Sequence, residues 1–259
     1  IRALSGPDVD ILAYRVRGSQ AVLTEEMSID PSRSLETAYR VTPFRDLEEA
    51  LAQKPDVAVI ANPTALHIPV ALACAQAGCH LLIEKPLAHS LEGVDRLLQV
   101  VEEKHLVVLM GYQFRFHPGL ELLHRLLREQ AVGTPLEARL EIGEYLPQWH
   151  PYEDYRTSYA ARTELGGGAA LTQIHELDMA CWLFGAPRRV FAIGGRSGCL
   201  EVDAEDTISA LLSVPLQDGW LLPVHVHMDY LHQPPVRSCL IVGSKGKIAW
   251  DYGRQMVQV

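Results

Sequence analysis

Short apolar segments alternate with helical patterns over the first 115 residues. The apolar segments have the length and near-continuous hydrophobicity of buried parallel strands. They are residues 9–14, 56–61, 79–83 and 106–110. Residues 65–77 and 90–103 place apolar side chains at helical spacing, and Ser90 is the expected N-cap of the second helix. This alternation predicts an α/β domain with a doubly wound parallel sheet over residues 1–115.

The pattern changes after residue 115. A helix over 120–128 leads to a strand over 137–145, a polar aromatic loop over 146–165, and a helix opened by three glycines, 166–168. The remaining chain predicts consecutive strands with turn residues between most of them. They are residues 190–194, 206–214, 220–230, 238–243 and 247–251. Residues 116–259 are therefore expected to form an α+β domain with a mainly antiparallel sheet.

Composition narrows the class of partners. The net charge is −9 and the chain has no basic block, which argues against nucleic acid and anionic membranes. No apolar run approaches the ~20 residues of a membrane span. The five cysteines are odd in number and have no C-x-x-C spacing, a pattern typical of reduced thiols. We therefore expect a cytoplasmic protein that acts on a small molecule.

A dinucleotide-binding domain carries G-x-G-x-x-G after its first strand, and a ribose-contacting residue about 20 positions later. If 11–14 is the second strand, that later position falls at Arg15, and the glycine loop would precede Ile1. We therefore expect a chain truncated at its start and also at its end. Arg15 and Arg17 suit the 2′-phosphate of NADP, which favours NADP slightly over NAD. The alternative is that both are solvent-facing loop arginines.

Two further turns follow predicted strands, where doubly wound sheets bind their ligands. Asn62-Pro63-Thr64 opens the helix that contains His67, and Thr64 is placed to cap it. The alternative is a well-capped turn without a ligand. Lys85 follows the next strand and would point into the crevice, where burial and a nearby nicotinamide cation would lower its pKa. Alone, such a turn is more often surface structure.

Several motifs occur together in one order along the chain. They are Asn62-Pro63-Thr64 to His67, Glu84-Lys85-Pro86, residues 111–116 (GYQFRF), Gly166-Gly167-Gly168, His175-Glu176-Leu177-Asp178, residues 182–185 (WLFG) and residues 243–248 (GSKGKI). In these the chain resembles the glucose–fructose oxidoreductase, inositol dehydrogenase and rhizopine-catabolism (Gfo/Idh/MocA) family. The resemblance implies a Rossmann domain followed by an α+β domain with a large open sheet. That sheet often mediates oligomerisation, so we expect a homodimer or homotetramer.

The resemblance also implies a reaction. Lys85 would lie beside the nicotinamide and the reacting hydroxyl, and His175 would complete the catalytic site from the second domain. Hydride would pass between NAD(P) and a secondary hydroxyl or keto group of a sugar, polyol or nucleotide sugar. A base must then take the hydroxyl proton, and histidine titrates near neutral pH. Glu84 and Gln113, in the same motifs, are further expected cofactor contacts.

One departure concerns the turn before His175. Many family members have an aspartate there, whereas this chain has Thr172 and Gln173. Threonine can bind a substrate hydroxyl but cannot act as a base. The base would then be His175 or Lys85, with Asp178 as a candidate to orient the imidazole from position i+3. Helical spacing places Thr172, His175, Glu176 and Met179 on one face, opposite an apolar face with Leu171, Ile174, Leu177 and Cys181.

The loop between 145 and 162 is rich in the side chains that bind sugars. Tyr145, Trp149, Arg156 and Arg162 are the expected substrate contacts there. A loop held by ordinary aromatic packing is an equally good interpretation. His225 and His227 share a strand face without a third ligand, so we predict no metal site. Two rival functions remain: a reductase of a C=N or C=C bond on the same fold, and a cofactor-binding homologue without turnover.

Overall fold

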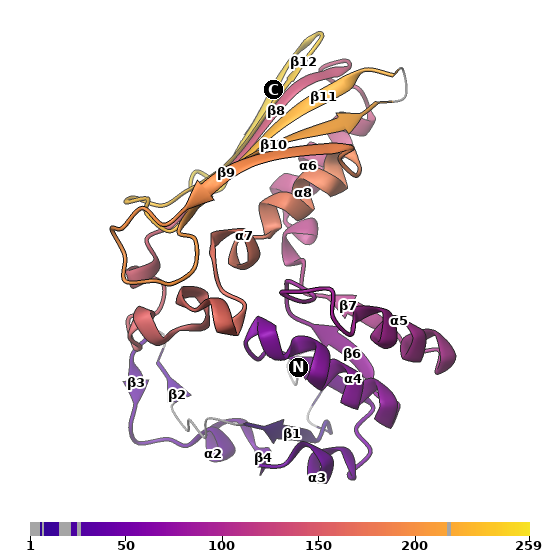
Figure 1. Ribbon diagram of the computed structural model, residues 1–259, viewed down its shortest axis with the longest axis vertical. Coiled ribbons are helices and arrows are strands. Elements are labelled where there is room, and N and C mark those ends of the chain that lie inside the picture. The colour runs from indigo at the N-terminus through magenta and orange to yellow at the C-terminus, as the bar shows by residue number, and fades with distance from the viewer. Residues whose placement is uncertain (1–5, 7, 16–21, 25–26, 217–218) are drawn as a thin grey trace.

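The computed structural model describes residues 6, 8–15, 22–24, 27–216 and 219–259. Figure 1 shows two layers of structure, with the N-terminal parallel strands below and a broad sheet above. The four predicted strands of the first half are β1 (Ile11–Tyr14), β5 (Val57–Ile60), β6 (His80–Ile83) and β7 (Val108–Met110). Helices α4 (His67–Ala77) and α5 (Val94–Glu103) pack against β5–β7.

The parallel strands form two separate ladders in the described part of the chain. β5, β6 and β7 pair in parallel, and β1 pairs instead with β4 (Val41–Phe44), a strand that the apolar pattern did not predict. Pro43 and the outward Thr42 weaken the apolar signal of β4. Four more short elements were not predicted: β2 (Val22–Leu23) pairs with β3 (Ile29–Asp30), while α2 (Leu35–Tyr39) and α3 (Leu47–Leu51) lie beside β4.

Two predicted helix caps are wrong. The N-cap of α5 is Gly93, at φ +77°, and not Ser90, because a turn over 90–93 delays the start of the helix. Thr64 does not cap α4 either, because a single 3-10 turn, η1 (Thr64–Leu66), precedes that helix and Leu66 occupies its N-cap position. These differences move helix starts by a few residues and leave the order of elements unchanged.

The second half contains one sheet of seven strands in the order β14-β13-β12-β8-β11-β10-β9. The strands are β8 (Pro135–Gly143), β9 (Arg189–Gly195), β10 (Thr207–Pro215), β11 (Leu221–Asp229), β12 (Val236–Gly243), β13 (Gly246–Asp251) and β14 (Met256–Gln258). All neighbours pair antiparallel except β8 and β11, which are parallel. The short β14 was not predicted.

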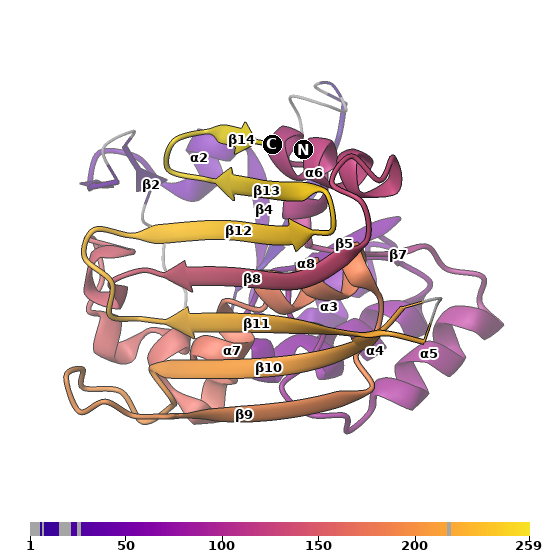
Figure 2. The ribbon, with the colours of Figure 1, turned by 90° about the horizontal axis from the view of Figure 1, so that it is seen from above.

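Helices cover one face of this sheet and leave the other open. Figure 2 looks onto the open face, with α6 (Pro118–Arg128), α7 (Ala169–Thr172) and α8 (His175–Phe184) behind the strands. Alternate residues of each strand enter a core with these helices, among them Leu140, Val224 and Trp250. The sequence predicted a mainly antiparallel sheet in this half, and the structure confirms it.

The two halves meet closely at Gly166, directly after the 3-10 turn η6 (Thr163–Leu165). Gly166 has φ +77°, and a Cβ built there would lie 2.7 Å from Thr64 Cβ and 3.1 Å from the Ala65 nitrogen. Only glycine tolerates both this backbone conformation and this approach. The first of the three glycines therefore brings the second domain onto the Asn62–Thr64 turn. The predicted boundary at 115/116 falls within the 3-10 segment η2 (Gln113–Phe116) and remains a prediction.

Candidate active site

Lys85 stands at the carboxyl end of β6 and reaches across to the second domain. Its ammonium Nζ donates a 2.7 Å hydrogen bond to the Thr172 carbonyl oxygen. Strand β6 ends at Ile83, Glu84 N donates to the Ile60 carbonyl, and the Lys85–Pro86 peptide is cis. The strand end thus positions the lysine, and its charged tip lies at the interface between the domains.

The helix that carries His175 is interrupted, contrary to the single helix predicted. α7 ends at Thr172, and α8 begins at His175. The Gln173 amide side chain leaves the helix direction and donates a 2.8 Å hydrogen bond to the Asp229 carbonyl of β11. Glu176 N then bonds Gln173 O, so the Thr172 carbonyl is left to accept from Lys85. The interruption creates the contact between the two domains.

The two predicted helix faces differ in burial. Thr172, His175, Glu176 and Met179 lie together, and each is less than 5% exposed. On the other predicted face, Leu177 is partly buried against the core and Cys181 is exposed. The polar face therefore points into the protein, where its side chains must find partners or a ligand.

His175 is enclosed by aromatic rings of the segment that links the two halves. Its ring lies 4.9 Å from the Phe114 ring and 6.1 Å from the Tyr112 ring, measured between centroids. Burial, together with the charges of Lys85 and Arg237, lowers the pKa of His175 to about 3. The expectation that this histidine titrates near neutral pH is therefore wrong. It remains neutral, and its buried Nδ1 has no hydrogen-bond partner within the described chain.

The pKa of Lys85 is lowered from its ordinary value. Burial is the main cause, and the Arg237 charge acts in the same direction. Carboxylates of Glu84, Glu176 and Glu144 oppose this by favouring the ammonium. A lysine in such surroundings loses its proton more readily than an exposed lysine does. Of the two predicted reaction-centre residues, Lys85 is thus the better proton carrier.

Behind these residues lies an ion pair that the sequence analysis did not identify. Glu176 is fully buried and accepts a 2.9 Å hydrogen bond from Arg237 Nε on β12. Burial raises the pKa of Glu176 to about 7, although Arg237 opposes the shift. Arg237 Cζ lies 4.2 Å from the Phe114 ring centroid. Its strand alternation places Arg237 on the inward face with Cys239, and this was the available signal.

Asp178 does not orient His175, as had been considered from their spacing. Its carboxylate receives two hydrogen bonds from Arg115, at 2.9 Å from Nε and 2.6 Å from Nη2. This fork–fork pair joins α8 to the linking segment η2. Asp178 instead anchors the segment that carries Tyr112 and Phe114, and so acts on His175 only indirectly.

The turn after β5 has the features expected beside a cofactor. The buried Asn62 Oδ1 has no hydrogen-bond partner among the described residues. Pro63 and the buried Thr64 complete the turn. His67 Nε2 lies 2.9 Å from the Asn62 carbonyl oxygen, and His67 Nδ1 lies 2.7 Å from the Pro86 carbonyl oxygen. The ring therefore links this turn to the Lys85 turn.

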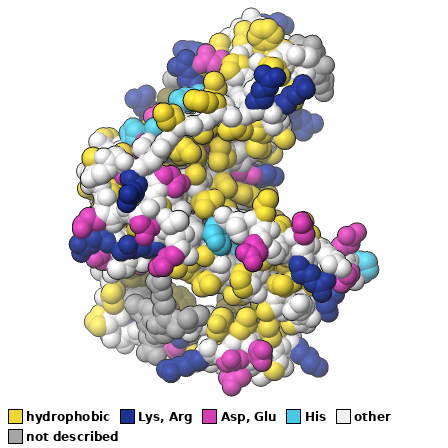
Figure 3. Space-filling view, viewed as in Figure 1, with side chains coloured by type: hydrophobic (Ala, Val, Ile, Leu, Met, Phe, Trp, Pro, Cys, Tyr) yellow, Lys and Arg dark blue, Asp and Glu magenta, His cyan; other side chains and the backbone are white. Residues whose placement is uncertain are grey.

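A third strand end closes this side of the site. A Cβ on Gly111, just after β7, would lie 2.9 Å from a carboxylate oxygen of Glu84, so the absent side chain leaves room for that carboxylate. Gln113 follows on η2 and is exposed. Figure 3 shows the surface hollowed between the two halves of the molecule, with apolar side chains gathered in the recess. The turns after β5, β6 and β7 thus lie at one sheet edge, as parallel strands require.

Arg15 lies at the end of β1, where the sequence placed the ribose contact. Its backbone N–H donates to the Phe44 carbonyl, and its guanidinium pairs with Glu36 of α2. The Glu36 carboxylate partly neutralises this guanidinium. Arg17, the second expected phosphate ligand, lies outside the described residues.

The aromatic loop is held largely by its own contacts. Trp149 packs edge-on against Tyr230 at 5.4 Å, and Tyr145 joins the same small core. Arg156 pairs with Asp154 and Glu201, and Arg162 pairs with Asp203. The two arginines therefore stabilise the loop, which supports the packing interpretation for them.

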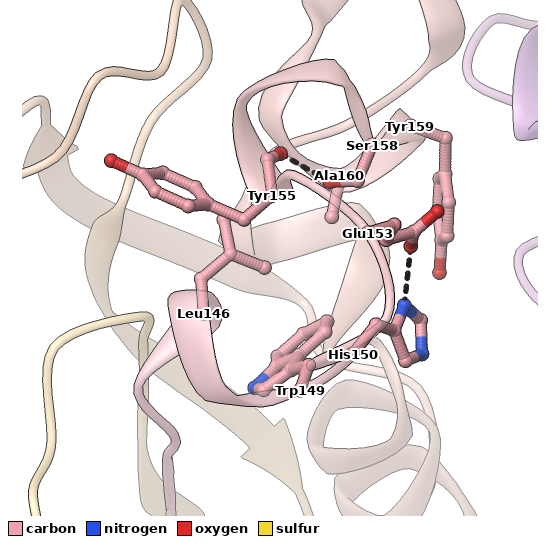
Figure 4. Close-up of a pocket in the computed structure, with 8 residues that line it drawn as sticks. All are labelled: Leu146, Trp149, His150, Glu153, Tyr155, Ser158, Tyr159 and Ala160. Atoms are coloured by element: carbon pink, nitrogen blue, oxygen red, sulfur yellow. Dashed lines mark hydrogen bonds and ion pairs between the residues drawn. The ribbon is translucent and has the colours of Figure 1, made fainter. Parts of the chain in front are cut away.

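One part of the loop does approach the site. Figure 4 shows a small pocket lined by eight residues, with Tyr159 beside Glu153 and His150. The pocket holds about 10 Å³, which is room for roughly one water molecule. Burial raises the pKa of Tyr159, and so do the charges of Glu84 and Glu153. Tyr159 therefore lies within electrostatic reach of Glu84 in the Lys85 turn.

The described residues include neither a grouping of metal-ligand side chains nor a helix that could span a membrane. Among them, no group of three His, Cys, Asp or Glu side chains has the arrangement of a metal site. His227 instead contacts Ser209 Oγ at 2.7 Å and Asp229 Oδ2 at 3.0 Å. None of the helices described has the length and hydrophobicity needed to cross a bilayer.

Family models match both halves of the chain. The model for the oxidoreductase family with an NAD-binding Rossmann fold (GFO/IDH/MocA) matches residues 8–112. The model for the C-terminal domain of the same family matches residues 120–249. The two matches follow one another in the order that the motifs predicted.

Relatives of known activity are similar over part of their length. A levoglucosan dehydrogenase of Pseudarthrobacter phenanthrenivorans is 32% identical over 56% of this chain and 37% of its own. A UDP-N-acetylglucosamine 3-dehydrogenase of Acidithiobacillus ferrooxidans is 32% identical over 56% of this chain and 42% of its own. The chain thus matches less than half the length of either relative.

A solved structure extends the similarity to both domains. The WlbA dehydrogenase of Bordetella pertussis, in complex with NADH and UDP-GlcNAcA, superposes with a TM-score of 0.73 at 28% identity. The match covers 83% of this chain and 61% of that one. With its two domain matches and this shared architecture, the chain belongs to the GFO/IDH/MocA family of oxidoreductases.

Proposed function

We propose that this protein transfers hydride between a nicotinamide cofactor and a secondary hydroxyl or keto group of a sugar, polyol or nucleotide sugar. The observation that carries the proposal is the contact between Lys85 Nζ and the Thr172 carbonyl, at 2.7 Å. It brings the lysine of the Rossmann half to the start of the helix that bears His175. Family relatives named as dehydrogenases of levoglucosan and UDP-N-acetylglucosamine support this substrate class.

The residues at the carboxyl ends of β5–β7 fit a nicotinamide dinucleotide. Asn62 Oδ1 is buried without a protein partner, and Gly111 leaves space beside Glu84. We propose Asn62, Pro63, Thr64, Glu84, Lys85 and Gln113 as its contacts, with His67 bracing the turn. When bound, the cofactor supplies the acceptor or donor of hydride.

Protein side chains would handle the proton and the substrate oxygen. Neutral Lys85 takes the hydroxyl proton during oxidation, and its ammonium returns the proton during reduction. The lowered pKa of Lys85 makes the neutral form accessible. Neutral His175, through its unpartnered Nδ1, and the unpartnered Thr172 hydroxyl hold the same substrate in register. Thr172 takes no proton, so its replacement of aspartate leaves the base role to Lys85.

The choice between NAD and NADP rests on Arg15. The sequence favoured NADP, but the ion pair between Arg15 and Glu36 weakens Arg15 as a ligand for a 2′-phosphate. We therefore propose NAD, in line with the NADH and NAD complexes among the similar structures. Calorimetric titration with both cofactors tests this. Tighter binding of NADP would overturn it, and Glu36→Gln is expected to shift the preference toward NADP.

A substrate panel tests the reaction. The protein is mixed with NAD and levoglucosan, UDP-N-acetylglucosamine or myo-inositol, and nicotinamide absorbance is followed. Reduction of NAD that is lost in Lys85→Met supports the proposal. Oxidation of NADH only with imines or enones would favour a C=N or C=C reductase. Cofactor binding with no turnover across sugars, nucleotide sugars, imines and enones would favour a non-catalytic homologue.

Substrate contacts from the aromatic loop are part of the proposal. Tyr145, Trp149, Arg156 and Arg162 remain predictions, and Tyr159 is added because of its proximity to Glu84. Arg156→Ala and Tyr159→Phe separate the possibilities. An increase in KM for Tyr159→Phe with little change for Arg156→Ala would place the substrate at the inner part of the loop.

Assembly and location complete the proposal. We propose a homodimer or homotetramer formed through the open face of the sheet, where Phe191, Ile193 and Leu211 are exposed apolar residues. Light scattering after gel filtration measures the mass, and a monomer at micromolar concentration would contradict the proposed assembly.

The cytoplasmic location expected from the cysteines is retained as a proposal, and a fluorescent fusion of the whole protein tests it.

A further inference from the structure

Glu176 and Arg237 connect α8 to strand β12 directly behind His175. The carboxylate is fully buried, and the Arg237 side chain is 12% exposed. A buried ion pair is weak evidence for stability, because desolvation of both charges can exceed their attraction. The next inward residue of β12, Cys239, belongs to the hydrophobic core, so the two charges depart from their apolar surroundings. The pair therefore calls for a role beyond stability.

The geometry shows what Arg237 touches. Its Cζ lies 4.2 Å from the centroid of the Phe114 ring, within the range of a cation–π contact. Phe114 in turn lies 4.9 Å from the His175 ring. The Phe114 ring thus contacts both the Arg237 guanidinium and the His175 imidazole. Glu176 holds the guanidinium through Arg237 Nε, and His175 is a proposed reaction-centre residue.

We propose that Arg237, held by Glu176, is a positioning residue that clamps the Phe114 ring onto the His175 imidazole and fixes this imidazole relative to Lys85. The kinetic consequence rests on the proposed function, whereas the ring geometry does not. Arg115 and Asp178 anchor the linking segment at one end, and Arg237 presses on its aromatic middle.

The charges around the pair support the same role. Glu176 faces Arg237 and lies within electrostatic reach of Glu144. Arg237 lowers the pKa of both Lys85 and His175, and Glu176 raises that of Lys85. Cys239 also responds to Glu176, because its raised pKa is due to burial and then to that carboxylate. The pair thus acts on His175 through the Phe114 ring, and its charges act on the pKa values of Lys85 and His175.

The first experiment measures His175 without any substrate. NMR on the protein labelled in histidine and phenylalanine reports the contact between the Phe114 and His175 rings and the ring titration. Wild type is expected to show the contact and a His175 pKa of about 3. Arg237→Met should lose the contact and raise that pKa, because removal of a nearby positive charge favours the imidazolium.

Arg254→Met is the matched control, because Arg254 is an exposed arginine paired with Asp251 on the neighbouring strand. It should leave both signals unchanged. An unchanged ring contact and titration in Arg237→Met would overturn the proposal. If Arg237→Met does not fold, Glu176→Gln, which keeps the volume of the side chain, decides by the same ring contact: its loss supports the clamp, and its persistence overturns it.

The second experiment uses turnover once a substrate is known. Arg237→Met should lower kcat roughly tenfold to a hundredfold while KM changes little, since misplacement of a positioned group acts on the reacting geometry. Arg237→Lys, which keeps the charge but not the planar group, should recover part of the loss. An unchanged kcat would overturn the proposal. If no substrate is turned over, the proposed function fails, and the NMR measurement still decides the clamp.

Discussion

The two sides of the active site are built differently. On the Rossmann side, the Lys85 turn is fixed by backbone bonds between neighbouring strands, such as Glu84 N to Ile60 O and Gly111 N to Ile83 O. On the other side, the α7–α8 junction buries four polar atoms that have no hydrogen-bond partner in the described chain. They are Thr172 Oγ1, Gln173 Oε1, His175 Nδ1 and Glu176 Oε2.

This difference suggests separate tasks for the two sides, with substrate recognition on one and a charged proton carrier on the other. An unsatisfied buried polar atom costs about 1–3 kcal/mol, so four in one short segment are an unusual concentration. Such atoms are tolerated where a ligand supplies the missing partners. The Rossmann side, by contrast, presents the Lys85 ammonium on a turn that backbone hydrogen bonds hold in place. We infer that the junction recognises the substrate, and that the turn carries its proton.

The largest expected effect is on the Rossmann side. Lys85→Met should lower kcat by about 10²–10⁴-fold, the usual contribution of a general acid or base. Binding of NAD, measured by calorimetry, should weaken far less. Lys104→Met, at the exposed end of α5, is the control and should behave as wild type. Retention of full turnover in Lys85→Met would assign the proton to another group and break the comparison.

His175→Asn tests the recognition side and should lower kcat/KM by roughly tenfold to a hundredfold, through lost substrate contacts.

His175 also makes the stability of the wild-type protein depend on pH. The folded pKa of about 3 lies below the ordinary 6.5. The neutral buried ring therefore contributes stability that is present above 6.5 and is lost as the pH falls toward 3.

Thermal unfolding at several pH values measures this contribution. Between pH 7 and pH 4, the Tm of wild type should fall by more than that of His175→Asn, by a difference on the order of several degrees. Equal losses in the two proteins would show that His175 is not held neutral by burial.

Gly166→Ala sharpens the comparison by separating the two sides. Gly166 has a positive φ, and a Cβ at this position would lie too close to Thr64 and Ala65. The Tm of Gly166→Ala should therefore fall by several degrees, and its affinity for the cofactor should weaken about tenfold. Gly198→Ala is the control, because Gly198 has a similar φ of +81° but no atom within 4 Å of the built Cβ. It should lose stability through strain alone. Equal cofactor affinity in both variants would exclude a role for the close approach.

The smallest effect is expected for Asp178→Asn. Arg115 is partly exposed, so loss of the carboxylate charge should cost little stability. The variant loosens η2, and kcat should fall only a few-fold. A loss as large as that of His175→Asn would mean that Asp178 orients the imidazole after all. Steady-state kinetics of the two variants side by side make this distinction.

Local patterns predicted much of the fold. Near-continuous apolar strands indicated the α/β domain, because burial on both faces leaves a direct trace in sequence. Consecutive strands with turn residues between them indicated the antiparallel sheet. The Lys85 turn could be proposed as a site because its motif is contiguous in the chain. β4 was missed because its apolar signal is broken by Pro43, and Arg237 because a single arginine in a strand does not reveal its partner.

The sequence by itself determined the family, both domain types and most of the longer elements, and it offered Lys85 and His175 as candidates for the reaction centre. The tertiary structure decided how the pKa values of these candidates shift. It buried His175 beside Phe114 and brought the Arg237 charge near it, which lowers the pKa of the ring, and it turned Asp178 toward Arg115. The physical reason is that a motif records residue identity over short separations. A pKa depends on burial and on charges brought from distant parts of the chain.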